Sequence, residues 1–129
     1  MAWLAALCLV AGGLQAEIPT HQFTLRWQHS IEKIDWEEDY LIVGDWLFLD
    51  RARVRGSGAG MEPPAGSVYA KGVWHYRPAP DMRWTRGLLL ARSAFARDYA
   101  LCVAGTCHPM SDWIPVSAGT TRAQPCPRR

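Results

Sequence analysis

The apolar runs of this chain are short and end at Gly, Pro or Asp, and this constrains the fold most. In QFTLRWQHSI (residues 22–31), Phe23, Leu25 and Trp27 alternate with polar residues, as in a strand with one buried face. No window keeps the 3.6-residue period of an amphipathic helix. Short strands with turns about every ten residues are typical of antiparallel sheets. The sequence therefore predicts an all-β fold, a small antiparallel barrel or sandwich of about eight strands.

The segment YLIVGDWLFL (residues 40–49) contains the clearest hairpin signal, a Gly44-Asp45 turn between two apolar runs. A two-residue loop places Val43 opposite Trp46 and Tyr40 opposite Leu49. Continuing the same register outward predicts the pairs Glu38–Arg51, Trp36–Arg53 and Asp39–Asp50. SVYAKGVWHY (residues 67–76) predicts a second hairpin that turns near Lys71-Gly72.

This register would place Asp39 opposite Asp50, with Glu37 beside them, and like charges in that position repel. A hard cation such as calcium would neutralise these three carboxylates, which makes them weak metal candidates. Pairing with arginine is the alternative. Residues 1–50 carry two basic residues against eight acidic ones, a net charge of −6, whereas residues 51–129 carry twelve against four, a net charge of +8. Pairing between the two halves is the simpler expectation.

With 129 residues, the chain is expected to form one β domain over residues 1–117, followed by a flexible C-terminal tail over residues 118–129. The apolar start could be a signal peptide, but no Lys or Arg precedes the apolar run, and ALCLVAGG is echoed by ALCVAGTC later in the chain. We therefore expect residues 4–11 to form a strand. The run is too short to span a membrane as a helix. A net charge of only +2 argues against nucleic acid as a partner.

The sequence LCVAGTCHPM places Cys102 and Cys107 around an Ala104-Gly105 turn. In a two-residue hairpin these cysteines form a non-hydrogen-bonded pair with Cα atoms about 4.5 Å apart, so a disulfide is predicted in an exported protein. Cys8 and Cys126 could pair or remain free. Cys102, Cys107 and His108 also spell a Cys-x4-Cys-His pattern, but a single such motif is weak evidence for haem or zinc. We expect no cofactor.

Three blocks, FTLRWQHSIEK, WEEDY and RVRGSGAGMEPP, resemble a family of small bacterial proteins classified only as a domain of unknown function, number 1850. The resemblance extends from about Cys8 to about Pro109. Ile34-Asp35 departs from the family pattern, in which we expect Thr or Arg at position 34. The residues that match the hallmark blocks are His29, Ser30, Glu32, Lys33, Glu37 or Glu38, Gly58, Gly60 and Glu62.

The resemblance implies that family members are encoded beside TRAP-type solute transporters of the TAXI class and that some are exported. We therefore expect an extracytoplasmic, non-enzymatic accessory or ligand-binding module whose partner is a transporter component or a small solute. The expected binding residues are His29, Ser30, Glu32, Lys33, Glu38, Gly58, Gly60 and Glu62. One alternative is a metal-assisted hydrolase that uses His29 and nearby carboxylates. Another is a purely structural role for these blocks. A serine hydrolase is disfavoured because His29 and Ser30, as neighbours on a strand, point to opposite faces.

Overall fold

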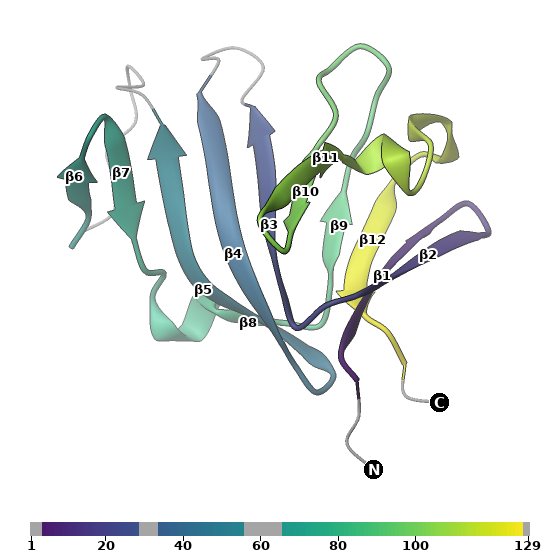
Figure 1. Ribbon diagram of the computed structural model, residues 1–129, viewed down its shortest axis with the longest axis horizontal. Coiled ribbons are helices and arrows are strands. Elements are labelled where there is room, and N and C mark those ends of the chain that lie inside the picture. The colour runs from purple at the N-terminus through teal and green to yellow at the C-terminus, as the bar shows by residue number, and fades with distance from the viewer. Residues whose placement is uncertain (1–3, 29–33, 56–65, 128–129) are drawn as a thin grey trace.

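The computed structural model describes residues 4–28, 34–55 and 66–127, and this part of the chain is built from β-strands and short 3-10 turns. It confirms the predicted all-β class. The strands form two antiparallel sheets that are not closed into a barrel, so the architecture is a sandwich (Figure 1). The described residues contain twelve strands, several of them only two to four residues long, which is why about eight were expected.

The smaller sheet has four strands. In spatial order they are β2 (Leu14–Pro19), β1 (Ala6–Ala11), β12 (Thr121–Pro125) and β9 (Leu88–Leu90).

The larger sheet has eight strands. Seven of them follow the spatial order β11 (Thr106–Pro109), β10 (Ala100–Val103), β3 (Gln22–Gln28), β4 (Asp35–Val43), β5 (Trp46–Arg55), β7 (Val73–Tyr76) and β6 (Val68–Ala70). The eighth, β8 (Trp84–Thr85), pairs with β5. The 3-10 turns are η1 (Pro80–Met82), η2 (Met110–Asp112) and η3 (Val116–Ala118).

The core lies between the two sheets and draws on both. Leu7 and Leu9 of β1 and Leu101 of β10 have no exposed surface, and Phe23 and Leu25 of β3 are also buried. Full burial of a leucine side chain contributes about 1.5–3 kcal/mol. The alternation seen in the sequence of β3 therefore turns one face of the larger sheet, here called the inner face, toward the smaller sheet. The opposite face, called the outer face, carries Thr24 and Arg26.

The predicted hairpins are present. β4 and β5 join at Gly44-Asp45, with Val43 opposite Trp46 and Tyr40 opposite Leu49. The β6–β7 hairpin turns at Lys71-Gly72, and the β10–β11 hairpin turns at Ala104-Gly105. In both turns the two central residues have positive φ, with Lys71 and Ala104 at 52°. This is the turn geometry that matches the right-handed twist of paired strands.

The N-terminal segment forms a strand in this structure. Ala6–Ala11 pairs with β2 on one side and with β12 on the other. None of the helical segments in the described ranges is long and apolar enough to cross a membrane.

The flexible tail expected over residues 118–129 was wrong for its central part. Thr121–Pro125 forms β12 between β1 and β9, and Thr121 and Ala123 are almost completely buried. Cys126, which follows this strand, forms a disulfide with Cys8, and the two Cα atoms are 4.9 Å apart. The covalent bond and the buried alternate side chains explain why this Arg- and Pro-rich segment is part of the sheet.

Candidate functional site

Most of the residues that the sequence assigned to the site lie outside the described part of the chain. These are His29, Ser30, Glu32, Lys33, Gly58, Gly60 and Glu62. The structure does describe the strand residues that flank the segments 29–33 and 56–65, which hold these positions. Gln28 at the end of β3 pairs with Asp35 at the start of β4, and Asp35 pairs with Arg55 at the end of β5. The ends of β3 and β5 and the start of β4 therefore lie at the same end of the larger sheet (Figure 1).

The pairing of β4 with β5 differs from the prediction beyond Tyr40. The register shifts by one residue, so that Asp39 lies opposite Arg51, and Asp50 is the extra residue of a β-bulge. The predicted pairs Glu38–Arg51, Trp36–Arg53 and Asp39–Asp50 were therefore wrong. The bulge separates the two aspartates and lets Ala52 and Val54 follow Leu49 on the inner face, because a one-residue insertion reverses the alternation of side chains.

Arg83 satisfies the backbone of this bulge. Its Nε donates to the Leu49 carbonyl at 2.9 Å, and its Nη2 donates to the Asp50 carbonyl at 2.6 Å. Its guanidinium also lies 4.4 Å from the centre of the Phe48 ring. A side chain from a segment distant in sequence thus stabilises the irregular backbone that sets the register of the acidic residues.

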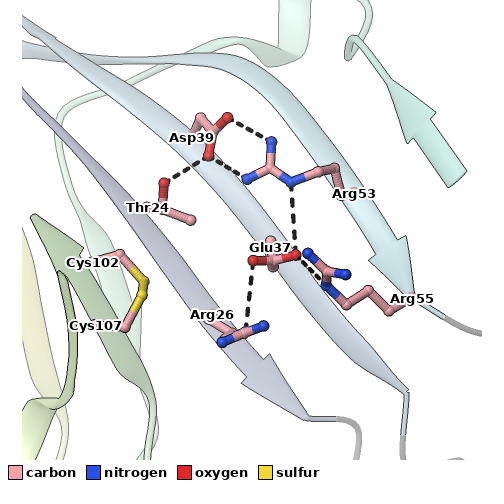
Figure 2. Close-up of a disulfide and its surroundings, with 8 residues drawn as sticks. All are labelled: Thr24, Arg26, Glu37, Asp39, Arg53, Arg55, Cys102 and Cys107. Atoms are coloured by element: carbon pink, nitrogen blue, oxygen red, sulfur yellow. Dashed lines mark hydrogen bonds and ion pairs between the residues drawn. A yellow bond between two sulfur atoms is a disulfide. The ribbon is translucent and has the colours of Figure 1, made fainter. Parts of the chain in front are cut away.

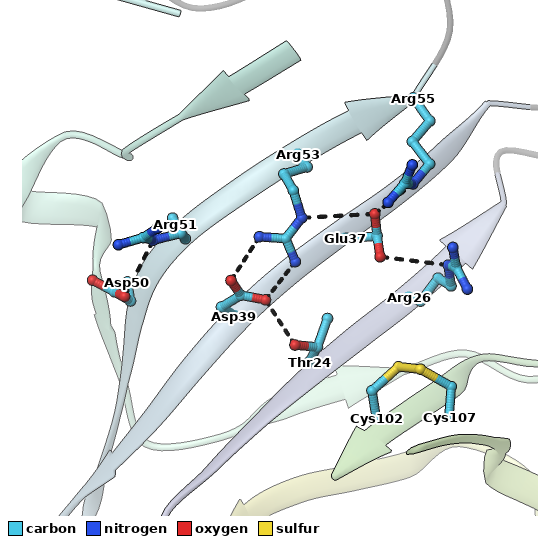
Figure 3. A network of polar contacts seen from close by, with 10 residues as sticks. All are labelled: Thr24, Arg26, Glu37, Asp39, Asp50, Arg51, Arg53, Arg55, Cys102 and Cys107. Carbon is cyan, nitrogen blue, oxygen red and sulfur yellow. Dashed lines mark hydrogen bonds and ion pairs between the residues drawn. A yellow bond between two sulfur atoms is a disulfide. The ribbon is translucent and has the colours of Figure 1, made fainter. Parts of the chain in front are cut away.

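The outer face carries a network of alternating charges (Figure 3). Arg53 donates two hydrogen bonds to the Asp39 carboxylate, both of 2.6 Å, and the Thr24 hydroxyl donates a third at 2.7 Å. Glu37, almost fully buried, accepts a 2.7 Å hydrogen bond from Arg55. Arg26 and Arg53 lie at 3.6 and 3.7 Å from the same carboxylate. The expected pairing of acids in the first half with arginines in the second half is present here.

Burial alone would raise the pKa of Asp39. The hydrogen bonds from Arg53 and Thr24 and the positive charges of Arg53 and Arg51 outweigh this effect, so the pKa of the carboxyl lies below its ordinary value.

The three weak metal candidates are all engaged by arginine. Glu37 and Asp39 belong to the network, and the Asp50 carboxylate lies 3.5 Å from Arg51 and 3.6 Å from Arg83. Within the described ranges, no three His, Cys, Asp or Glu side chains are grouped so that they could hold a metal ion. The hydrolase alternative also depends on His29, which is not among the described residues.

The predicted Cys102–Cys107 disulfide is present beside this network (Figure 2). The two residues are direct cross-strand partners, and Cys102 also pairs with Thr24 on the neighbouring strand. Their Cα atoms are 3.9 Å apart. Because both sulfur atoms are bonded to each other, neither is available to attach haem or to bind zinc.

Glu38 is the one predicted binding residue that the structure describes, and it lies on the inner face. In register across the sheet, Leu25, Glu38, Ala52 and Tyr76 lie side by side. The Tyr40 hydroxyl donates a 3.0 Å hydrogen bond to Glu38 Oε1. Among the described residues, no Lys, Arg or His forms an ion pair with this carboxyl. Burial raises the pKa of Glu38, and the hydrogen bond from Tyr40 only partly offsets the rise.

Glu38 lines a cleft of about 370 Å³ between the two sheets. The larger sheet contributes Leu25 and Trp27 of β3 together with Glu38, and Tyr99 stands just before β10. Gly87 and the three leucines of β9, Leu88–Leu90, form the opposite wall. This volume lies within the range of small-molecule sites, and the lining combines aliphatic and aromatic side chains with polar groups.

Aromatic rings surround one end of this cleft. Trp27 stacks on Trp36 with ring centres 6.0 Å apart, and Tyr99 lies 6.4 Å from Trp27. The alternation in β3 predicted that Trp27 lies on its apolar face, but nothing in the sequence associated Trp27 with Leu88–Leu90 or Tyr99. Those residues are more than 60 positions away in the chain, and no local pattern links them.

The sequence profile of the family described as "Domain of unknown function (DUF1850)" matches residues 23–110. The match covers more than half of the chain, from the start of β3 to the beginning of η2. The chain belongs to this family. Comparisons with curated proteins and with solved structures gave no significant match. The family match includes the outer network, Glu38 and all residues that line the cleft.

Proposed function

We propose that this chain is a non-enzymatic binding module that takes a small solute into the cleft between β3, β4 and β9. The observation that carries the proposal is the position of Glu38. Its carboxyl is largely buried in an apolar, aromatic-lined cleft and receives one hydrogen bond, that from Tyr40, from the described residues. Buried polar groups are normally paired, so an incompletely paired carboxyl at a cleft is a candidate for ligand contact.

The outer face offers a second hollow of similar volume, about 350 Å³, lined by Thr24, Asp39, Arg51 and Arg53 among others. In this hollow, the Asp39 carboxylate already accepts two hydrogen bonds from Arg53 and one from the Thr24 hydroxyl. A ligand there would have to replace strong contacts that the protein makes with itself. In the inner cleft, Glu38 accepts a single hydrogen bond from a described residue, Tyr40, so a ligand there would replace fewer internal contacts. The inner cleft is therefore the preferred site.

Binding is favoured over catalysis because, among the described residues that line the cleft, Glu38 is the only acid and Tyr99 is the only other ionisable side chain. Burial and the nearby Asp98 raise the pKa of Tyr99, which makes this phenol a poor base near neutral pH. General acid–base chemistry commonly uses two groups whose pKa values are pushed apart toward the working pH. The described cleft offers recognition chemistry instead.

The proposed location is outside the cytoplasm. The two disulfides use all four cysteines of the chain, and such bonds persist in oxidising compartments. The link to a TRAP-type transporter is supported by the family resemblance alone. Affinity capture from membranes that contain co-expressed transporter subunits tests that link, and failure to capture any subunit would contradict it.

The cleft is tested by nuclear magnetic resonance titration of the oxidised protein with 2-phenylethanol, a small neutral probe. We expect the signals of the Trp27 indole and of the Leu88–Leu90 amides to shift. The amides of Thr24 and Arg53 on the outer face should remain unchanged. Leu88→Trp should block binding by filling the cleft, whereas Phe95→Trp, at a fully exposed position, should not. Shifts confined to the outer face would refute the proposed site, and so would the absence of shifts with 2-phenylethanol and with both of its charged analogues, 2-phenylethylamine and phenylacetate.

His29 and Glu32 enter the proposed site from sequence only. His29→Ala and Glu32→Ala are expected to abolish solute or partner binding without lowering the melting temperature. Retained binding in both variants would contradict their predicted role, and a sharp loss of stability would favour the structural alternative.

A further inference from the structure

The carboxylate of Glu38 narrows the chemical class of ligand that the cleft would bind. We infer that the ligand is an organic cation, an ammonium group carried on an apolar or aromatic body, with Glu38 as its charge partner and Trp27 and Tyr99 as its ring contacts. The inference rests on the proposed function, because it assigns a chemical class to the same cleft.

The charge of Glu38 is not balanced by any described residue. The ionisable groups that face it from the packed strands are phenols: Tyr40 on the same strand and Tyr76 on β7. Burial and the Glu38 carboxylate raise the pKa of both, so both remain neutral hydrogen-bond donors. The neighbouring acids on β4, Glu37 and Asp39, each form an ion pair with an arginine. Glu38 forms no ion pair with a described residue. A cationic ligand would supply the missing positive charge.

Two aromatic rings line the cleft together with that carboxyl. Trp27 and Tyr99 both line the cleft, with ring centres 6.4 Å apart and planes inclined at 51°. Faces of Trp and Tyr attract ammonium groups through the ring quadrupole, by about 0.5–2 kcal/mol depending on how far the site is desolvated. A carboxyl next to two such rings is a recurring arrangement for recognising amines.

The remaining wall of the cleft includes aliphatic side chains. Leu25, Leu88 and Leu90 contribute hydrocarbon surface, and a volume of about 370 Å³ fits a small aromatic or branched aliphatic group. A free metal cation would gain nothing from these side chains, because hard cations require several oxygen ligands. An anionic solute would be repelled by the Glu38 carboxylate. The guanidinium of Arg122, which packs against Gly87, already donates a 2.6 Å hydrogen bond to Gln124.

The test uses three probes that share one body and differ in charge: 2-phenylethylamine, 2-phenylethanol and phenylacetate. Dissociation constants are measured near pH 7 by the same magnetic resonance titration on the oxidised protein. We expect the amine to bind at least about tenfold more tightly than the alcohol and more tightly still than the acid. Glu38→Gln should remove the preference for the amine but leave binding of the alcohol in place.

Two further variants separate charge from shape. Trp27→Leu should weaken the amine more than the alcohol. Asp45→Asn removes an exposed carboxylate at the β4–β5 turn and should change none of the three affinities. Equal binding of the three probes, or a preference for phenylacetate, would overturn the cation inference while leaving the binding module intact. Failure of all three to bind in the cleft would overturn both.

Discussion

The strand β4 holds three consecutive acids in two different environments. Glu37 and Asp39 point to the outer face, where Arg26, Arg53 and Arg55 surround them. Glu38, between them in the chain, points to the inner face and receives only the Tyr40 hydroxyl from the described residues. Side-chain alternation along a strand is enough to separate them. The acidic run WEED is therefore not one site, because Glu37 and Asp39 lie on the opposite face of the sheet from Glu38.

The pKa values of Asp39 and Glu38 differ in the same way. The pKa of Asp39 is lowered because its arginine contacts outweigh burial, whereas the pKa of Glu38 is raised because burial outweighs its single hydrogen bond. The outer acid thus stabilises the fold when it is charged. The inner acid costs stability when it is charged. A residue that lowers the stability of the free protein yet lines a cleft is a typical functional residue.

Removing Arg53 should give the largest change, because this arginine bridges both outer acids. Arg53→Met leaves Asp39 without its bidentate partner and removes one of the three arginines around Glu37. We expect a loss of about 3 kcal/mol in the free energy of unfolding, measured by urea denaturation at neutral pH. Arg97→Met, at an exposed position, is the matched control and should have little effect. A loss equal to that of the control would show that the network is not stabilising.

Asp39→Asn should have a smaller effect, about 1–2 kcal/mol of destabilisation near pH 7, because the amide keeps its shape and can still accept one hydrogen bond. The pKa of Asp39 is lower in the folded than in the unfolded protein, so its contribution is present above the ordinary value of 3.8 and is lost as the pH falls through the folded pKa. Urea denaturation of both proteins from neutral to acidic pH should show the two curves converging at low pH. A pH-independent gap would contradict the electrostatic explanation.

Glu38→Gln should have the opposite sign and the smallest size, a stabilisation on the order of 1 kcal/mol near pH 7. Gln retains the acceptor for Tyr40 and removes a charge that burial disfavours. Because the folded pKa is raised, the wild-type protein loses stability as the pH rises from the ordinary value of 4.5 toward the folded pKa. The gain should therefore vanish well below pH 4.5, as thermal unfolding of the two proteins can show. A destabilised variant at neutral pH would mean that Glu38 has a cationic partner within the protein.

Local patterns predicted much of the fold. The alternation in β3, the Gly44-Asp45 turn and the Cys102–Cys107 hairpin each depend on residues close together in the chain, and the structure confirms all three. The bulge at Asp50 also had a local signal. In LFLDRARV the alternating apolar positions are Leu47 and Leu49 before Asp50 but Ala52 and Val54 after it, a change from odd to even numbers that one inserted residue produces.

The remaining features depend on distant pairings that no local pattern specifies. β12 finds its place through Cys8 and β1, at the other end of the sequence, so its Arg and Pro residues resembled a tail. The cleft combines Glu38 on β4 with Leu88–Leu90 on β9, and only the packing of one sheet on the other brings them together. The sequence indicated Glu38 through the family resemblance, and alternation along β4 puts it on the same face as Tyr40. No local pattern showed that this face lines a cleft.

The Cys8–Cys126 bond gives the molecule an unusual mechanical property. It closes a loop of 118 residues that includes every strand except the first residues of β1. A force applied through the segments before Cys8 and after Cys126 would pass through the sulfur–sulfur bond and would bypass both sheets. Stretching such a protein would reveal almost none of its length until a reductant opened the bond, and roughly 400 Å of chain would then become extensible. The sandwich is thus shielded from tension along its own chain for as long as its surroundings are oxidising.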